Sequence, residues 1–111
     1  MSLEQNDFKQ DLIVLKGSSN DYYRFRTYYF ADALPKTLGV IAVITGYDFG
    51  HPTPIFIGEL NNAYNTIQEY EQWACFLENE GEYYAVHTSE NKEKTQAAIA
   101  DLISKYKPTC K

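Results

Sequence analysis

Residues 37–58 read Thr37-Leu38-Gly39-Val40-Ile41-Ala42-Val43-Ile44, then Thr45-Gly46-Tyr47-Asp48-Phe49-Gly50-His51-Pro52-Thr53, then Pro54-Ile55-Phe56-Ile57-Gly58. The two apolar runs are short and rich in β-branched residues, and a segment with Gly, Asp, His and Pro separates them. This pattern predicts two adjacent strands of one sheet joined by a loop. Since residues 40–44 are all apolar, we expect the first strand to be central and covered on both faces.

Further strands and helices are predicted around this pair. Apolar runs and turn residues indicate strands at 11–16, 22–30 and 82–87, and helical spacing indicates helices at 62–73 and 91–106. The expected fold class is α/β (α+β), a small central antiparallel sheet flanked by helices. Residues 1–35 are expected to form an N-terminal extension of two strands packed on a core of residues 36–111, in one compact domain. The helix residues expected to be buried are Ile67, Tyr70, Ile99, Leu102 and Ile103.

Composition limits the class of protein. A chain of 111 residues, 44% hydrophobic and 15% aromatic, fits one folded domain and excludes disorder. No apolar run is long enough for a transmembrane helix, and the first residues do not resemble a secretory signal. Cys75 and Cys110 have neither metal-ligand nor disulfide-scaffold spacing, so we expect reduced thiols in a cytoplasmic protein. His51 is a lone histidine in the loop of residues 46–53, which predicts no metal site.

Four short motifs follow one another in the chain: Gly39-Val40-Ile41, Phe56-Ile57-Gly58, the segment from Asn62 to Tyr70, and Leu102–Pro108. In this order they resemble the Gly-Ile-Tyr, Tyr-Ile-Gly, Asn-Leu-x-x-Arg and Leu-Ile-x-x-Tyr-x-Pro motifs of the GIY-YIG nuclease-like domain. The resemblance covers residues 36–111. It implies the antiparallel sheet and packed helices of that family.

The resemblance also implies where catalytic groups would stand. Family members cut phosphodiesters with one divalent metal, two motif tyrosines, an arginine, a further histidine or tyrosine and a metal-binding glutamate. The corresponding positions here are Ile41, Phe56, Thr66, Tyr70 and Ile99. Only Tyr70 keeps a polar group that the family accepts, whereas the chemistry needs a base, a positive clamp and a carboxylate. The resemblance therefore implies a degenerate site, with no catalytic residue, no metal and no cofactor.

The distribution of charge argues against nucleic acid as a partner. Residues 38–91 contain no lysine or arginine but eight acids: Asp48, Glu59, Glu69, Glu71, Glu78, Glu80, Glu82 and Glu90. Binding to a phosphate backbone needs cations, because counterion release supplies much of the affinity. With no base inside the block to neutralise them, six of these acids are expected to form a negative surface: Glu59, Glu69, Glu71, Glu78, Glu80 and Glu82. Glu69, Glu71 and Glu78 are its candidate binding residues for a basic protein; solubility alone is the alternative.

Two other features offer candidate sites. The predicted strand 22–30 has one face expected in the core (Tyr23, Phe25, Thr27, Tyr29) and one expected to be partly exposed, which carries Arg24 and Arg26. These arginines could stack on bases, but arginine side chains lying over tyrosine rings are the favoured interpretation. An apolar pocket for a small ligand, lined by Ile41, Phe56 and Ile99, also stays open.

The sequence thus predicts a non-catalytic, acidic, GIY-YIG-like interaction module in the cytoplasm. Its expected partner is a basic protein or a second copy of the chain, with nucleic acid unexpected and no membrane association. The alternative is a divergent nuclease or nucleic-acid-binding protein whose missing groups come from a partner.

Overall fold

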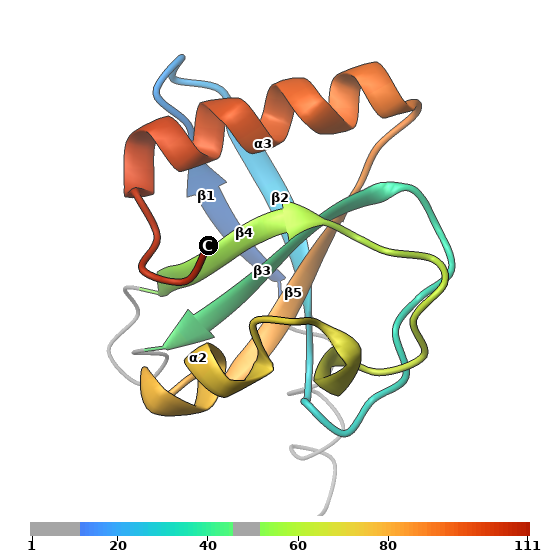
Figure 1. Cartoon of the computed structure of the whole chain (residues 1–111). Coiled ribbons are helices and arrows are strands. Elements are labelled where there is room, and N and C mark those ends of the chain that lie inside the picture. The colour runs from blue at the N-terminus through green and yellow to red at the C-terminus, as the bar shows by residue number, and fades with distance from the viewer. Residues whose placement is uncertain (1–11, 46–51) are drawn as a thin grey trace, which may run out of the picture.

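A computed structural model describes residues 12–45 and 52–111 and has an α+β fold (Figure 1). One antiparallel sheet has the strand order β1-β2-β5-β3-β4. Its strands are β1 (Leu12–Lys16), β2 (Tyr22–Tyr28), β3 (Gly39–Thr45), β4 (Thr53–Glu59) and β5 (Tyr83–Thr88). The helices are the 3-10 helix η2 (Ile67–Glu69) and the α-helices α2 (Trp73–Glu78) and α3 (Lys92–Tyr106). The expected fold class is confirmed, and the loop histidine His51 lies outside the described residues.

Strand β3 is the centre of the sheet, as its sequence predicts. It pairs with β4 on one side and with β5 on the other, and all its residues except Thr45 are buried. Alternate side chains point to opposite faces, so Val40, Ala42 and Ile44 enter one hydrophobic cluster while Ile41 and Val43 enter another. A strand buried in this way needs a covering layer on each face.

Helix α3 supplies the first layer and packs on β3, β4 and β1 (Figure 1). Its N-cap is Asn91, whose side chain accepts from the Lys94 N–H and so satisfies a backbone donor of the first turn. The expectation for its buried stripe is partly wrong. Leu102 is buried and Ile99 is half-buried, but Ile103 is 40% exposed. The residues that face the sheet are Thr95, Ala98 and Leu102, one helical turn apart, which turns Ile103 toward solvent.

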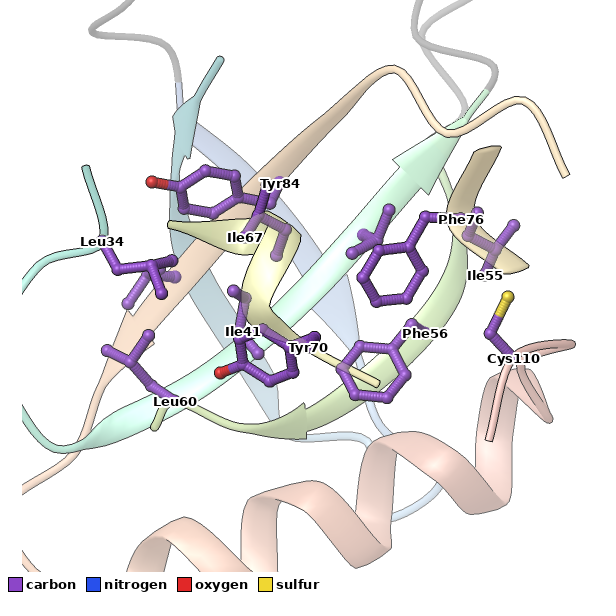
Figure 2. Packing of buried hydrophobic residues seen from close by; sticks show 12 residues of the cluster. Leu34, Ile41, Ile55, Phe56, Leu60, Ile67, Tyr70, Phe76, Tyr84 and Cys110 are labelled. Atoms are coloured by element: carbon purple, nitrogen blue, oxygen red, sulfur yellow. The ribbon is translucent and has the colours of Figure 1, made fainter. Parts of the chain in front are cut away.

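The second layer is mostly irregular chain filled with aromatic rings (Figure 2). The ring centroids of Phe56 and Phe76 lie 5.1 Å apart, and Tyr64 meets Tyr70 edge-on at 4.9 Å. Such edge-to-face and tilted pairs add to the energy of burial. Ile67 and Tyr70 are buried here, as predicted.

The predicted single helix over residues 62–73 is wrong. Asn61 Oδ1 accepts from the Ala63 N–H at 2.9 Å, and Tyr70 has an extended backbone with ψ 140°. Asparagine side chains compete with helical hydrogen bonds. Helix therefore forms only as the short η2 and, from Trp73, as α2.

A disulfide joins Cys75 in α2 to Cys110 after α3, with Cα atoms 5.9 Å apart and a sequence separation of 35 residues. The expectation of reduced thiols is therefore wrong. The two cysteines are too far apart in sequence to show a pattern, and only the fold brings α2 and the segment after α3 to the same face. The Cys110 N–H also donates to Ile55 O at 2.7 Å. This segment is thus fixed to both α2 and β4.

The N-terminal strand pair continues the sheet, since β2 pairs with β5 from Arg26↔Val86 to Tyr28↔Tyr84. Phe25 and Thr27 are buried as predicted, but Tyr29 is exposed because β2 ends at Tyr28. No helix in the described ranges is long and apolar enough to cross a membrane.

Asp101 of α3 holds the turn between β1 and β2. Its carboxylate accepts from the Ser19 N–H at 2.8 Å, from Ser19 Oγ at 2.6 Å and from Tyr23 Oη at 2.8 Å. The hydrogen bonds from Ser19 and Tyr23 lower the pKa of this carboxyl group. The strand pair is thereby tied to the helix as well as to the sheet.

Loss of the disulfide should destabilise the fold. In the chain-entropy model, a disulfide that closes a loop of 35 residues stabilises the fold by about 4 kcal/mol. The double variant Cys75→Ser/Cys110→Ser should therefore lose about 2–4 kcal/mol of unfolding free energy, and so should the reduced wild type. Urea unfolding with and without reductant measures this. The double variant is the control, since reductant should not change it. Two alkylatable thiols in native protein prepared without reductant would contradict the disulfide.

Candidate functional site

The positions that the family resemblance marks as catalytic do not form one site. Ile41 is fully buried and Phe56 is 7% exposed, both in the cluster beneath α2 and η2. Ile99 packs instead against the cluster beneath α3, on the opposite face of the sheet. A small-ligand pocket lined by these three residues is therefore excluded by the fold. Ile41 and Phe56 serve as core residues (Figure 2).

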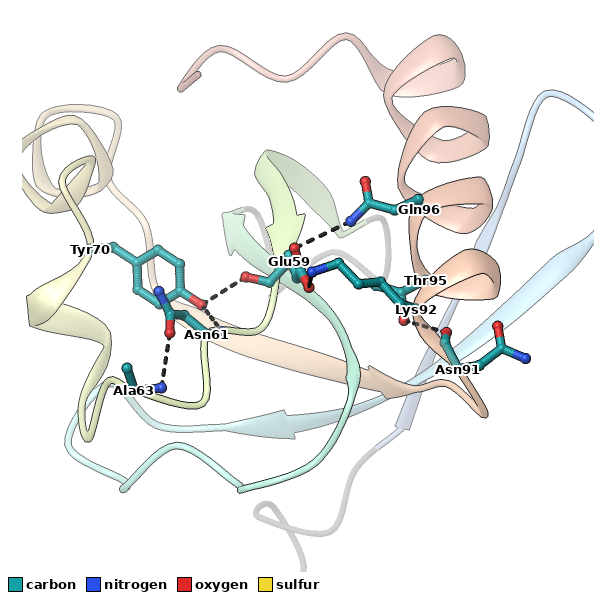
Figure 3. A network of polar contacts seen from close by, with 8 residues as sticks. All are labelled: Glu59, Asn61, Ala63, Tyr70, Asn91, Lys92, Thr95 and Gln96. Atoms are coloured by element: carbon teal, nitrogen blue, oxygen red, sulfur yellow. Dashed lines mark hydrogen bonds and ion pairs between the residues drawn. The ribbon is translucent and has the colours of Figure 1, made fainter.

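Tyr70 is the one family-compatible polar residue, and its hydroxyl is occupied by the backbone. It donates to Glu59 O at 3.0 Å and accepts from the Asn61 N–H at 2.9 Å (Figure 3). Burial raises the pKa of this phenol to about 12. The hydroxyl therefore stays protonated near neutral pH and ties the end of β4 to the segment before α2.

Thr66 and Glu69 form a helix cap. Thr66 is the N-cap of η2, and the Glu69 carboxylate accepts from the Asn65 N–H at 2.7 Å and the Thr66 N–H at 3.0 Å. Such a capping box satisfies backbone donors at the start of a helix. Glu69, predicted as a binding residue, thus has a structural role. The Thr66-x-x-Glu69 spacing is a sequence signal for this cap. The prediction of one helix over residues 62–73 did not use that signal.

A polar cleft of about 600 Å³ opens beside Tyr70, between the end of β4, the segment before α2 and the start of α3. On its wall Glu59 Oε2 lies 3.5 Å from Lys92 Nζ, and Glu59 Oε1 accepts from Gln96 Nε2 at 3.2 Å (Figure 3). The expectation that no base neutralises the acidic block is therefore wrong for Glu59, because Lys92 reaches it from outside the block.

The cleft offers hydrogen-bonding and ion-pairing groups but no set of metal ligands. Glu71 and Gln72 line it together with the Glu59–Lys92 pair. Within residues 12–45 and 52–111 no group of three or more His, Cys, Asp or Glu side chains is placed to hold a metal ion.

Three exposed glutamates flank α2: Glu71 before it, Glu78 at its last residue and Glu80 just after it. We call Glu71, Glu78 and Glu80 the acidic surface. None of the three forms an ion pair with another described residue. All three side chains are exposed to solvent.

Arg24 and Arg26 lie elsewhere, on the exposed side of β2 opposite Val14 and Leu12 of β1. On this face Lys16 Nζ lies 5.5 Å from the centroid of the Tyr22 ring. The structure therefore does not bring the two arginines together with the acidic surface, and the predicted binding residues fall on separate elements.

Comparisons of this chain with models of protein families, with curated proteins and with solved structures found no match. The resemblance to the GIY-YIG nuclease-like domain accordingly stays a prediction drawn from the four motifs.

Removing the Tyr70 hydroxyl tests its structural role. Tyr70→Phe leaves Glu59 O and the Asn61 N–H without this partner, so it should lower the free energy of unfolding by about 1–3 kcal/mol near neutral pH. The phenol has an ordinary pKa of 10.0 and a folded pKa of about 12. As pH rises, the unfolded chain loses this proton first, so the stabilisation is complete below the lower value and is lost toward the higher one.

Urea unfolding from neutral pH to about 12 should therefore show that Tyr70→Phe loses less stability than wild type over the alkaline range. Tyr23 also has a raised pKa and is present in both proteins, so it does not affect the difference. Parallel curves for the two proteins would contradict the assignment.

Proposed function

We propose that this chain is a non-catalytic protein-binding domain that uses its acidic surface to bind a basic protein partner. The observation that carries the proposal is that residues at the positions marked by the family resemblance have structural roles. Ile41 and Phe56 build the core, Thr66 caps a helix, and the Tyr70 hydroxyl bridges two backbone segments. None of these groups is left to act on a substrate.

The GIY-YIG likeness remains part of this proposal. The antiparallel β3–β4 pair, with β5 on the other side of β3, is compatible with it. The proposed domain would then keep the framework of the family while its catalytic positions hold core and capping residues. The alternative is a divergent nuclease or nucleic-acid-binding protein whose missing groups come from a partner, and the test below separates this outcome.

Electrostatics supports the acidic surface as the contact region. Glu71, Glu78 and Glu80 are exposed and unpaired within the described residues, whereas Glu59 and Glu69 are committed to internal contacts. Unopposed like charges repel one another, and a basic partner would relieve this and speed association. A second copy of the chain has the same acidic surface and would need to dock with another region.

The Cys75–Cys110 disulfide supports an oxidising compartment rather than the cytoplasm as the place where the domain works. Structural disulfides persist in secreted, periplasmic or cell-surface proteins and are rare where glutathione keeps thiols reduced. We therefore propose partners that share such a compartment.

Charge reversal tests the proposal. Glu71→Lys/Glu78→Lys should reduce capture of the partner from a native extract by at least about tenfold, with the melting temperature nearly unchanged because both side chains are exposed. Glu69→Gln is the matched control, because it weakens the η2 cap and stability but should preserve capture. Partner binding should also weaken steeply with salt.

Treating the extract with nuclease separates the alternatives. Capture of the same proteins after nuclease treatment supports a protein partner. Loss of capture, or cleavage of supercoiled or single-stranded DNA by the purified chain with Mg²⁺ or Mn²⁺, would instead favour the divergent nuclease. Unchanged capture by Glu71→Lys/Glu78→Lys would contradict the acidic surface.

A further inference from the structure

A second, apolar groove runs along the outer edge of β4. It has a volume of about 820 Å³ and lies between β4, the last turn of α3 and the segment that follows α3. Its apolar lining comes from Phe56, Ile57, Gly58, Ile103, Pro108 and Cys110. This groove explains why Ile103, predicted to be buried in the core, is 40% exposed.

Gly58 lines this groove and leaves room for the Phe56 ring. A Cβ atom at residue 58 would come within 2.7 Å of the Phe56 ring, closer than such atoms approach in folded proteins. The ring can lie against the backbone at residue 58 only because glycine leaves that space empty. The groove is therefore shaped by the sequence of β4 itself.

β4 is an edge strand, so half of its backbone groups point away from the sheet. The Leu60 N–H donates to Gly39 O. This bond shows which residues of β4 bond to β3 and which point away from it. Phe56 and Gly58, opposite Val43 and Ile41, bond to β3, while the N–H and C=O groups of Ile57 and Glu59 point outward.

Two of the outward groups already have partners, on either side of Ile57. Ile55 O accepts from the Cys110 N–H at 2.7 Å, and Glu59 O accepts from Tyr70 Oη at 3.0 Å. The N–H and C=O of Ile57, between them, have no hydrogen-bond partner among the described residues. One donor and one acceptor on the outer side of β4, at a residue that lines the groove, therefore have no partner within the described residues.

The rim of the groove is positively charged. Lys107 and Lys111 line it and are exposed, and no acid is among the described residues that line it. In a chain of net charge −5, this local excess of cations indicates a negatively charged partner. The acidic surface has the opposite preference, so the two regions suit different partners.

We propose that this groove binds an extended peptide that carries an apolar side chain followed by acidic residues. The peptide adds to β4 as a short strand and exchanges two hydrogen bonds with the backbone of Ile57. Its apolar side chain contacts Ile103 and Pro108, and its carboxylates pair with Lys107 and Lys111. Strand addition with side-chain pockets is an established mode of peptide recognition. The disulfide keeps the Pro108–Cys110 wall of the groove in place.

Hydrogen exchange and chemical shifts of the Ile57 amide report directly on this contact. The probes are an end-blocked peptide Val-Ile-Val-Asp-Glu, its basic counterpart Val-Ile-Val-Lys-Lys, and a backbone N-methylated form of the acidic peptide. In the free protein the Ile57 amide should exchange much faster than those of Phe56 and Gly58. The acidic peptide should slow it at least about tenfold at saturation, because an ordered hydrogen bond restricts exchange to opening events.

Variants separate the two contributions to binding. Lys107→Asn/Lys111→Gln removes both charges and suits the left-handed backbone at residue 107 (φ 49°). It should weaken the acidic peptide about tenfold, while the matched control Lys94→Gln, an exposed lysine outside the groove, should not. Ile103→Gln should weaken binding similarly, whereas Leu77→Gln, an exposed apolar residue of α2, should not.

Several results would overturn the proposal. They are an Ile57 amide that the acidic peptide leaves unchanged, equal binding of the acidic and basic peptides, or full binding by the N-methylated form. Protection of Ile57 that rises with protein concentration, together with dimer formation, would assign the groove to a second copy of the chain instead. The acidic peptide should still bind Glu71→Lys/Glu78→Lys, because neither residue lines the groove. This result would separate the groove from the acidic surface.

Discussion

Complete burial of β3 on both faces is the constraint on which the rest of this structure depends. A strand with no exposed face must be covered by two layers, and each layer must remove apolar area from water and satisfy its own backbone groups. The fold meets this need in two ways. On one face α3, a regular helix of 15 residues, covers the sheet with Thr95, Ala98 and Leu102. On the other, short helices and turns fill the space with aromatic rings.

The irregular layer needs more side-chain hydrogen bonds to its backbone than the helical layer does. Its backbone groups cannot bond within a long helix, so side chains do this instead: Glu69 caps η2, the Tyr70 hydroxyl bridges Glu59 and Asn61, and Asn61 closes a turn. The Cys75–Cys110 disulfide then joins this layer to the segment after α3. Four of the five positions that the GIY-YIG resemblance marks, Ile41, Phe56, Thr66 and Tyr70, fall within this layer or beneath it, whereas Ile99 packs beneath α3 on the other face. Here they serve packing and capping, which is why we favour binding over catalysis.

The sequence predicted those parts of the fold that follow from local pattern. The uninterrupted apolar run from Val40 to Ile44 identified the central strand, and helical spacing over residues 91–106 identified α3. The prediction failed where long-range contacts override local preference. Residues 62–73 have helical spacing, but asparagine side chains and the Tyr70 hydroxyl hold an irregular path. No local pattern could pair Cys75 with Cys110, or Glu59 with Lys92, because the fold alone brings them together. The groove at β4 could not be predicted from the sequence either, since it depends on which strand lies at the sheet edge.

The most direct test of this account is the free energy of unfolding of Ile41→Tyr, with Ile41→Val as the size control. Residue 41 is where the family has its first motif tyrosine, and here it is fully buried beside Phe56 and Tyr70. If the position serves packing, the larger ring and its buried hydroxyl should together cost about 3 kcal/mol or more. Ile41→Val should cost only about 1 kcal/mol. Wild-type stability in Ile41→Tyr, together with Mg²⁺-dependent DNA cleavage, would contradict the account.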